Sequence, residues 1–399
     1  MTTRANTIGE RIRELRNGWM TQQELATAAG VDVSLIRKLE QGQRHTASVA
    51  SLHRIARALD VDLGELFGRE ALPDAGPDAG VVALRRAVSD VDDLLGGLDA
   101  DPLPLDEARR TVTYLWGTYW SGKFDSLAGL IPPALAGTRA TLHEANLSDR
   151  PMAADALSRV YWVAGCTLAH MRQQDAAFMA VRRAVELANT ADDELLSAAL
   201  RGSVSWQLLV QGRFDEAERV ATRTAQSIEP TGDAGADHLS VFGSLIISAA
   251  TANARGNNAS RARDLLNESR EVAARVGVDR NDYETPFGPS QVVMQTVDVG
   301  VVTEDYAAAL RDAGAMPSEP GLPLAARARH MTDRAFAHTR LGEDDKALNL
   351  LLATEGMAPD WMQHQTLVKY VTRELLAREA RKSTRLRELA ERIGVTRTA

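Results

Sequence analysis

The chain has 399 residues, a formal net charge of −8 and a hydrophobic fraction of 44%. This length exceeds one ordinary core, so we expect two or more folded units, one of them an extended repeat array. The negative charge excludes a protein that coats nucleic acid over its whole surface. The single cysteine, Cys166, excludes an intramolecular disulfide and favours a reduced, cytoplasmic setting.

Charge is unevenly distributed along the chain. Residues 1–69 hold 10 Lys and Arg against 8 Asp and Glu, which leaves 36 against 46 for the rest. We therefore expect any anion-binding surface at the N-terminus. The first residues lack the apolar core of a signal peptide, and the longest apolar run, near residues 241–252, is too short and too interrupted to span a bilayer. We expect a soluble chain with no membrane partner.

Apolar residues at helical spacing predict five short helices in the first 69 residues. We expect them near residues 8–17, 21–29, 33–41, 50–59 and 63–67. Thr21 is placed to cap the second helix, and Glu24 three residues later completes a capping box. Gly30 lies where this helix must end, at a position that favours the left-handed conformation.

The third predicted helix has two unlike sides. Ile36 turns toward the apolar side, whereas a polar row of Ser34, Arg37, Lys38 and Gln41 lies on the other. Two helices joined by a tight turn with glycine, the second presenting Ser and basic side chains outward, have the geometry that enters a DNA major groove. The pattern therefore predicts a DNA-binding domain.

These residues carry a resemblance to a known family. The order of the helices, the segment TQQELA at 21–26, the turn at Gly30, IRKLEQG at 36–42 and LHRIARALDVDLGELF at 52–67 resemble the Xre family, the five-helix lambda-repressor-like domains of phage repressors. The resemblance covers about residues 7–68. It implies an all-α fold and recognition of double-stranded DNA.

The resemblance also implies roles for single residues. The positions that correspond to DNA contacts are Gln22 and Arg44 for the phosphate backbone and Val33, Ser34, Arg37 and Lys38 for the bases. Arg16 and Glu40 correspond to a pair that forms an internal salt bridge in relatives. Arg and Lys suit the guanine edge, Ser serves a base or a phosphate, and Val favours a thymine methyl group.

A linker and a repeat array follow the predicted DNA-binding domain. Residues 70–80, EALPDAGPDAG, read as a linker between a domain at 1–69 and a body at 81–399. In the body a short sequence pattern recurs six times. Its copies are SGKFDSL, RQQDAAF, QGRFDEA, GNNASRA, VTEDYAA and LGEDDKA, which start at residues 121, 172, 211, 256, 302 and 341. The steps between copies leave room for two helices each, so we predict six helical hairpins.

The recurring pattern has a typical order of residues: a turn with glycine, a capping aspartate, and alanine two residues later. This order resembles the tetratricopeptide repeat, and implies an all-α, right-handed solenoid of helical hairpins. The aspartates expected to cap the second helix of a hairpin are Asp125, Asp175, Asp215, Asp305 and Asp345. One or two capping helices are expected between residues 361 and 393.

The first helices of such hairpins line the concave surface of a solenoid, and this surface is a candidate ligand groove. Counting back from the start of each second helix places on it Trp116, Trp162, Trp206 and Phe336. Trp120 lies in the first hairpin, and the residues that flank the groove are Arg109, Arg159 and Arg329. An aromatic groove flanked by arginines suits a small, partly apolar ligand or a peptide. Equally, these aromatic residues fill gaps between long helices, because tryptophan is usually buried.

The segment DRNDYETPFGPSQVVM at 279–294 does not fit a continuous helix. Its prolines predict a constrained loop leading into a helix that starts near Ser290. The segment resembles the FGP-x-x-V sequence of actinobacterial proteins that join an Xre head to a tetratricopeptide-like body. Tyr283, Phe287 and Gln291 are candidate ligand contacts. A purely structural cap for the next helix is the alternative.

Catalytic and metal-binding motifs are absent from the sequence. It contains no HExxH, GxxxxGK[ST] or GxSxG motif and no paired cysteines. We therefore expect no enzymatic activity, no catalytic residues, no cofactor and no metal site.

Together these patterns predict a cytoplasmic transcriptional regulator. One small domain makes few phosphate contacts, so we expect a homodimer on an inverted-repeat operator. The architecture resembles Gram-positive quorum-sensing regulators, which implies control by a small-molecule or peptide effector. The alternative is an interaction scaffold, whose repeats dock a partner protein while the head only localises it on DNA.

Overall fold

The computed structural model describes residues 7–17, 20–44, 47, 49–59, 61, 79–91, 100–191, 193–378 and 384–395. The chain divides into two compact units. Unit 1 comprises Met1–Tyr119 and Phe124–Asp192, and unit 2 comprises Trp120–Lys123 and Asp193–Ala399. The regular elements of the described residues are helices, and one isolated bridge pairs Arg280 with Phe287. The predicted all-α fold class is confirmed.

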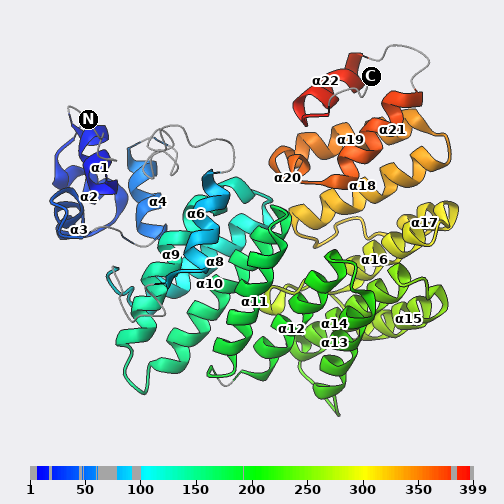
Figure 1. Ribbon diagram of the computed structural model, residues 1–399, viewed down its shortest axis with the longest axis horizontal. Coiled ribbons are helices and arrows are strands. Elements are labelled where there is room, and N and C mark those ends of the chain that lie inside the picture. The colour runs from blue at the N-terminus through cyan, green and yellow to red at the C-terminus, as the bar shows by residue number, and fades with distance from the viewer. Residues whose placement is uncertain are drawn as a thin grey trace. The chain divides into compact units, whose positions relative to one another are not determined.

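The first helices of unit 1 follow the predicted order. They are α1 (Ile8–Arg16), α2 (Gln22–Ala29), α3 (Val33–Glu40) and α4 (Val49–Ala58), coloured blue in Figure 1. The four corresponding predictions are confirmed. The fifth predicted helix, at 63–67, lies outside the described residues, as do most residues of the predicted linker.

Local hydrogen bonds explain where these helices begin and end. Thr21 and Glu24 form the expected capping box, with Thr21 N donating to Glu24 Oε2 at 2.7 Å and Glu24 N donating to Thr21 Oγ1 at 3.2 Å. Gly30 ends α2 in the left-handed conformation, at φ 61°. A second capping box, between Thr7 and Glu10, starts α1 and was not predicted. These short-range contacts satisfy backbone groups that a helix end leaves open.

A helix absent from the predictions follows the linker. α6 (Ala79–Val88) begins inside the residues read as linker and contacts α9, α10 and α11. The buried guanidinium of Arg139 on α9 donates to the Ala87 carbonyl at 2.6 Å and to Asp90 Oδ2 at 3.2 Å. This cation meets the negative end of the α6 dipole and fixes α6 to the hairpins.

All six predicted hairpins are present. Each consists of two helices joined by three residues, and Figure 1 shows the pairs in chain order. In unit 1 they are α8 (Leu105–Trp120) with α9 (Phe124–Glu144) and α10 (Arg150–His170) with α11 (Gln174–Ala188). In unit 2 they are α12 (Glu194–Val210) with α13 (Phe214–Ser227), α14 (Ala236–Arg255) with α15 (Ala259–Val276), α16 (Pro289–Val302) with α17 (Tyr306–Asp312), and α18 (Leu324–Arg340) with α19 (Asp344–Met357).

The hairpin turns share one backbone feature, a left-handed residue at their centre. In each turn the middle residue has a positive φ, between 61° and 77°; these residues are Gly122, Arg172, Gly212, Asn257, Glu304 and Gly342. A left-handed residue reverses the chain sharply between two helices. Three of the six are glycine, which adopts this conformation without steric cost. The glycine signal therefore identifies half of the turns.

The residue five positions after each left-handed residue packs against the preceding helix. It is fully buried in every hairpin; these residues are Leu127, Ala177, Ala217, Ala262, Ala309 and Ala347. In five of the hairpins it is alanine, whose small side chain lets the two helices approach closely. In the fifth hairpin the spacing from Asp305 pointed to Ala307, which is exposed, so that expectation was wrong by two residues.

The predicted aspartate caps need correction. Asp305 is the N-cap of α17 and accepts from Ala308 N at 3.2 Å. The other four lie at the second position inside their helices, where no capping geometry exists; they are Asp125, Asp175, Asp215 and Asp345. A carboxylate in the first turn still favours the helix through the dipole.

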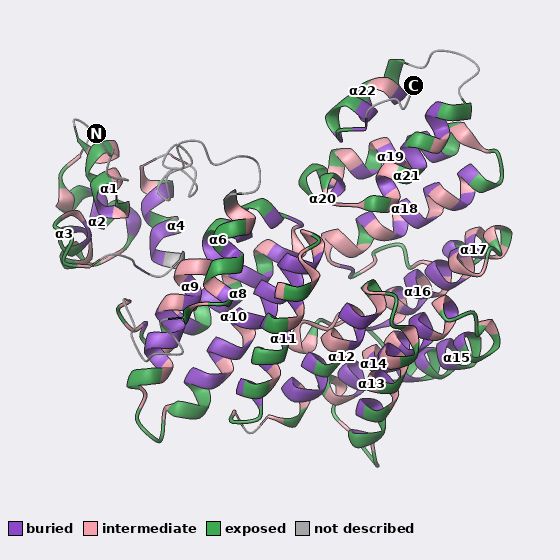
Figure 2. Cartoon of the chain, in the orientation of Figure 1, coloured by how far each residue is buried: buried purple, intermediate pink, exposed green. Residues whose placement is uncertain are grey.

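The chain ends in three further helices. They are α20 (Pro359–Gln363), α21 (Thr366–Arg378) and α22 (Thr384–Arg392), one more than the largest predicted number. Buried residues follow the helix faces that meet within each unit (Figure 2). In the described part of the chain, every helix is too short or too polar to span a lipid bilayer.

Candidate functional site

The helix α3 presents two different faces. Ile36 and Leu39 are buried, at 0% and 1% exposure, and hold α3 against the other helices of the N-terminal domain, which we call the head. Asp32 caps the helix, accepting a hydrogen bond from Ser34 N at 2.7 Å. Hydrogen bonds from Ser34, with added attraction from Arg37 and Lys38, lower the pKa of the Asp32 carboxyl. The cap is therefore ionised at neutral pH.

The opposite face of α3 carries its cationic side chains into solvent. Ser34, Arg37 and Lys38 are exposed, and Val33 is half-buried. Within the described residues Arg37 and Lys38 form no hydrogen bond through their side chains and no ion pair. The structure thus brings together the four residues predicted to face the bases, and leaves both cationic groups open to an anionic partner.

Gln22 is held by an internal ion pair. Arg16 Nε donates to Glu40 Oε1 at 2.7 Å and Arg16 Nη2 donates to Glu40 Oε2 at 2.9 Å, which confirms the predicted salt bridge. Gln22 Nε2 donates to the same carboxylate at 2.8 Å. Burial acts to raise the pKa of Glu40, but these hydrogen bonds outweigh it and lower the pKa. Glu40 therefore fixes the Gln22 amide at the start of α2.

Two arginines lie near the ends of α3. Arg44, which was predicted to contact the phosphate backbone of DNA, is half-buried in the loop after α3. Arg54 on α4 donates from Nη1 to the carbonyl of Gly30 at 3.1 Å, across the turn between α2 and α3. Sequence reasoning missed Arg54, because its partner is a backbone atom 24 residues away.

The candidate ligand residues of unit 1 lie in two environments. Trp116 and Trp162 are 2% and 1% exposed and pack edge to face, with ring centroids 5.0 Å apart. They fill the interior between α8 and α10. Arg109 is exposed, and half-buried Arg159 pairs with Asp155 at 3.0 Å on its own helix.

The segment 277–289 places two candidate residues of unit 2. Phe287 is buried against Gly243, where a Cβ atom would lie 2.1 Å from Phe287 Cζ. Tyr283 and Glu284 have φ values of 49° and 55°, a left-handed conformation that is costly for these residues. Glu284 Oε2 accepts from Trp120 Nε1 at 2.7 Å. α16 begins at Pro289, as the predicted loop required.

The first helices of the unit 2 hairpins contact one another in succession: α12 with α14, α14 with α16, and α16 with α18. The 3-10 helix η1 (Asp282–Glu284) contacts α12 and α14. Six candidate residues of unit 2 remain partly exposed on these elements or beside them; they are Trp120, Trp206, Tyr283, Gln291, Arg329 and Phe336. We call α12, α14, α16 and α18 with η1 the first-helix row.

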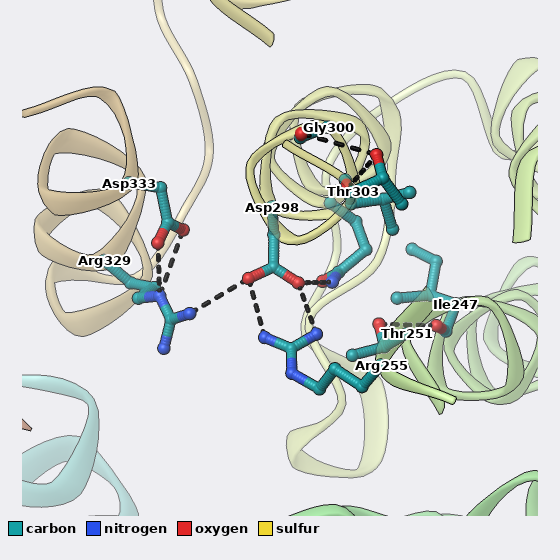
Figure 3. A network of polar contacts seen from close by, with 10 residues as sticks. Ile247, Thr251, Arg255, Asp298, Gly300, Thr303, Arg329 and Asp333 are labelled. Atoms are coloured by element: carbon teal, nitrogen blue, oxygen red, sulfur yellow. Dashed lines mark hydrogen bonds and ion pairs between the residues drawn. The ribbon is translucent and has the colours of Figure 1, made fainter. Parts of the chain in front are cut away.

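A charge network built on two buried carboxylates connects three helices of the first-helix row. Asp298 on α16 accepts from Arg255 on α14 at 2.8 and 2.9 Å, and from Arg329 Nη2 on α18 at 2.9 Å. Gln295 Nε2 donates to the same carboxylate at 2.8 Å. Arg329 Nε donates to both oxygens of Asp333, at 2.9 and 3.0 Å. Figure 3 shows the chain of contacts from Asp333 through Arg329 and Asp298 to Arg255.

The two carboxylates of this network differ in their hydrogen bonding. Asp298 accepts from three side chains, and although burial acts to raise its pKa, the two arginines lower it to about 2. Asp333 is 1% exposed and accepts from Arg329 Nε. Burial, with repulsion from Asp298, raises the pKa of Asp333 to about 6 despite the attraction of Arg329 and Arg255. Arg329 was predicted as a groove residue, and the network around it was not predicted.

One of three comparisons with known proteins supports the prediction for the N-terminal domain. The Helix-turn-helix family model HTH_3 matches residues 12–66, which confirms the Xre-type DNA-binding domain. The crystal structure of Bacillus thuringiensis PlcR in complex with the peptide PapR7 and DNA is similar to 87% of this chain, with 99% of the PlcR chain covered, 11% identity and a TM-score of 0.35. A comparison with curated proteins found no match.

Proposed function

We propose that this chain is a sequence-specific transcriptional regulator whose DNA contacts come from the exposed edge of α3. The observation that carries the proposal is the pair of cationic side chains, Arg37 and Lys38, that face solvent from a helix-turn-helix domain without an internal partner among the described residues. Arg pairs with a guanine edge through two hydrogen bonds. Gln22, held by Glu40, and Arg44 bind the phosphate backbone on either side.

The regulator acts as a homodimer on an inverted repeat. One α3 helix supplies few base contacts and few phosphate contacts, which is too little for firm specific binding at physiological salt. A second copy doubles both, and the two-fold symmetry of the dimer is matched by the symmetry of the operator.

A small-molecule or peptide effector binds the body and alters DNA binding. In unit 2 the first-helix row offers half-exposed aromatic, amide and cationic side chains, including Trp206, Gln291 and Arg329. Such a mixture suits a partly apolar ligand with a few polar groups. Trp116 and Trp162 contribute to the packing of unit 1 and have no ligand role in this proposal, because both are buried.

The test of DNA recognition is Arg37→Ala measured on operator fragments selected from genomic DNA. Loss of one base contact weakens specific binding by about 1–3 kcal/mol and relaxes the sequence preference at one position. The matched control is Arg182→Ala on α11, whose side chain is 75% exposed and pairs with Glu186 on its own helix. Equal affinity of Arg37→Ala and Arg182→Ala for the operator would show that Arg37 makes no base contact and would remove the observation on which the proposal rests.

The scaffold alternative gives a different result in the same assay. An effector that controls the protein changes the operator affinity of the purified chain when a metabolite extract is added. A scaffold keeps its operator affinity under these conditions, and recruits a protein to the operator through the repeats.

A further inference from the structure

The guanidinium of Arg329 has one nitrogen, Nη1, that takes no part in the charge network. Its Nε binds Asp333 and its Nη2 binds Asp298, so the guanidinium plane is fixed by two carboxylates. Within the described residues Nη1 makes no hydrogen bond, and it points away from both carboxylates in Figure 3. The side chain is 39% exposed, whereas Asp298 and Asp333 are 5% and 1% exposed. The network therefore presents a fixed cationic edge at the surface of the first-helix row.

We propose that this edge of Arg329 binds a singly charged carboxylate of the effector, and that Asp333 takes up a proton when it binds. The inference rests on the proposed function, since it names the chemical class that the first-helix row recognises. The unused Nη1 carries two N–H donors, and a charge-assisted hydrogen bond from a guanidinium to a carboxylate oxygen is strong. Because its orientation is fixed beforehand, little rotamer freedom is lost on binding.

The charges of the network explain the coupling to a proton. Arg255 and Arg329 balance Asp298 and Asp333 when both carboxylates are ionised, so an added anion meets no net attraction. Protonation of Asp333 leaves one positive charge, which a monoanion neutralises and a dianion overcompensates. The charged groups that act on Asp333 are Arg329 on its own helix, Asp298 on α16 and Arg255 on α14. A carboxylate is therefore favoured over a doubly charged phosphate.

The experiment uses the full chain without DNA, with acetate as the probe. Thermal unfolding is followed while sodium acetate replaces sodium chloride at constant ionic strength, at about pH 5.5 and about pH 7.5. The expected result is a saturable rise in Tm of about 2 °C at about 100 mM acetate near pH 5.5. Near pH 7.5 the apparent affinity is at least about tenfold weaker.

Variants separate a built site from a general ion effect. Asp333→Asn keeps the network at one positive charge, so its acetate affinity no longer depends on pH. The double variant Arg329→Gln with Asp333→Asn removes the binding edge without leaving a buried carboxylate unpaired, and loses the acetate response. Arg213→Gln removes an exposed arginine paired with Glu216 at 2.7 Å, and responds like the unaltered chain.

Two results overturn the proposal. An acetate response that survives in the double variant means that acetate acts as an adventitious ion only. A larger, Arg329-dependent response to sulfate than to acetate shows that the edge selects dianions, contrary to the charge argument. Neither result depends on DNA binding, so the outcome is independent of the operator test with Arg37→Ala.

Discussion

The α3 edge of the head and the charge network of unit 2 use the same residue type in opposite ways. Arg37 lies in solvent without an internal partner among the described residues, whereas Arg255 donates both Nη groups to one buried carboxylate. An unpaired surface guanidinium costs the fold nothing and is ready for phosphate or a base. A guanidinium within a buried network is fixed in place, and removal of its partner leaves a charge uncompensated. Arginine alone therefore does not identify a ligand site, and its partners decide its role.

The largest effect expected from this contrast follows the loss of Asp298. Asp298→Ala leaves Arg255 without its carboxylate partner and removes one of the two carboxylates of Arg329. We expect a loss of about 3–5 kcal/mol in the free energy of unfolding of unit 2. Urea unfolding followed by helical circular dichroism measures it.

Asp345→Ala is the matched control for this change. Asp345 is exposed in the first turn of α19, so its removal changes stability by about 0.5 kcal/mol at most. Similar losses for the two variants would show that the network contributes no more than a surface carboxylate.

A smaller effect, of opposite sign, is expected at Asp333. Its pKa in the folded chain, about 6, lies above the usual value of 3.8, so the folded state binds the proton more tightly. Stability is therefore lost as pH rises from about 4 to about 6, and the loss is complete above that range. Asp333→Asn, which cannot ionise, is expected to be more stable than the unaltered chain by about 1–3 kcal/mol near pH 8.

The pH dependence of unfolding checks this sign. The advantage of Asp333→Asn over the unaltered chain shrinks to nothing as pH falls toward about 4. Asp298 has the reverse linkage, because its pKa is lowered to about 2, and its contribution is lost only below about pH 4. An advantage of Asp333→Asn that stays constant from acid to alkaline pH would contradict ionisation of Asp333 as the cause.

The smallest effect is expected in the N-terminal domain, where the contact removed is a local helix cap rather than part of a charge network between helices. Thr21→Ala removes the side chain that accepts from Glu24 N, and costs about 1 kcal/mol. Hydrogen exchange of the α2 amides then speeds up by about fivefold. Thr27→Ala removes a hydroxyl that bonds within the helix to Gln23 O, and exchange is expected to stay unchanged or slow down.

Much of the fold was predictable because it depends on neighbours in sequence. The capping box at Thr21, the left-handed end of α2 at Gly30 and the position of all six hairpin turns follow from residues three to five positions apart. The errors lie where local signals are weak. The helix α6 was not predicted, and its first two residues were read as linker. The buried alanine of the fifth hairpin was placed two residues early, because Asp305 directly follows the left-handed residue Glu304.

The candidate ligand residues were only partly resolved by sequence. Arg329 was predicted to flank the groove and Gln291 to reach a ligand from the segment 279–294, and both are half-buried. The same spacing selected Trp116 and Trp162, which turn inward against each other. Whether a tryptophan on a helix faces a groove or a neighbouring helix depends on how that helix is packed, and periodicity alone does not give the packing.

By itself the sequence determined the helical class, the DNA-binding motif and the hairpin count, since helix caps, left-handed turns and apolar periodicity act over a few residues. Only the tertiary structure decided which cations are neutralised. Asp298 meets arginines 43 and 31 residues away on two other helices, and Glu40 meets Arg16 at a separation of 24. Charge pairing of this kind depends on distances between packed helices, which no local pattern encodes.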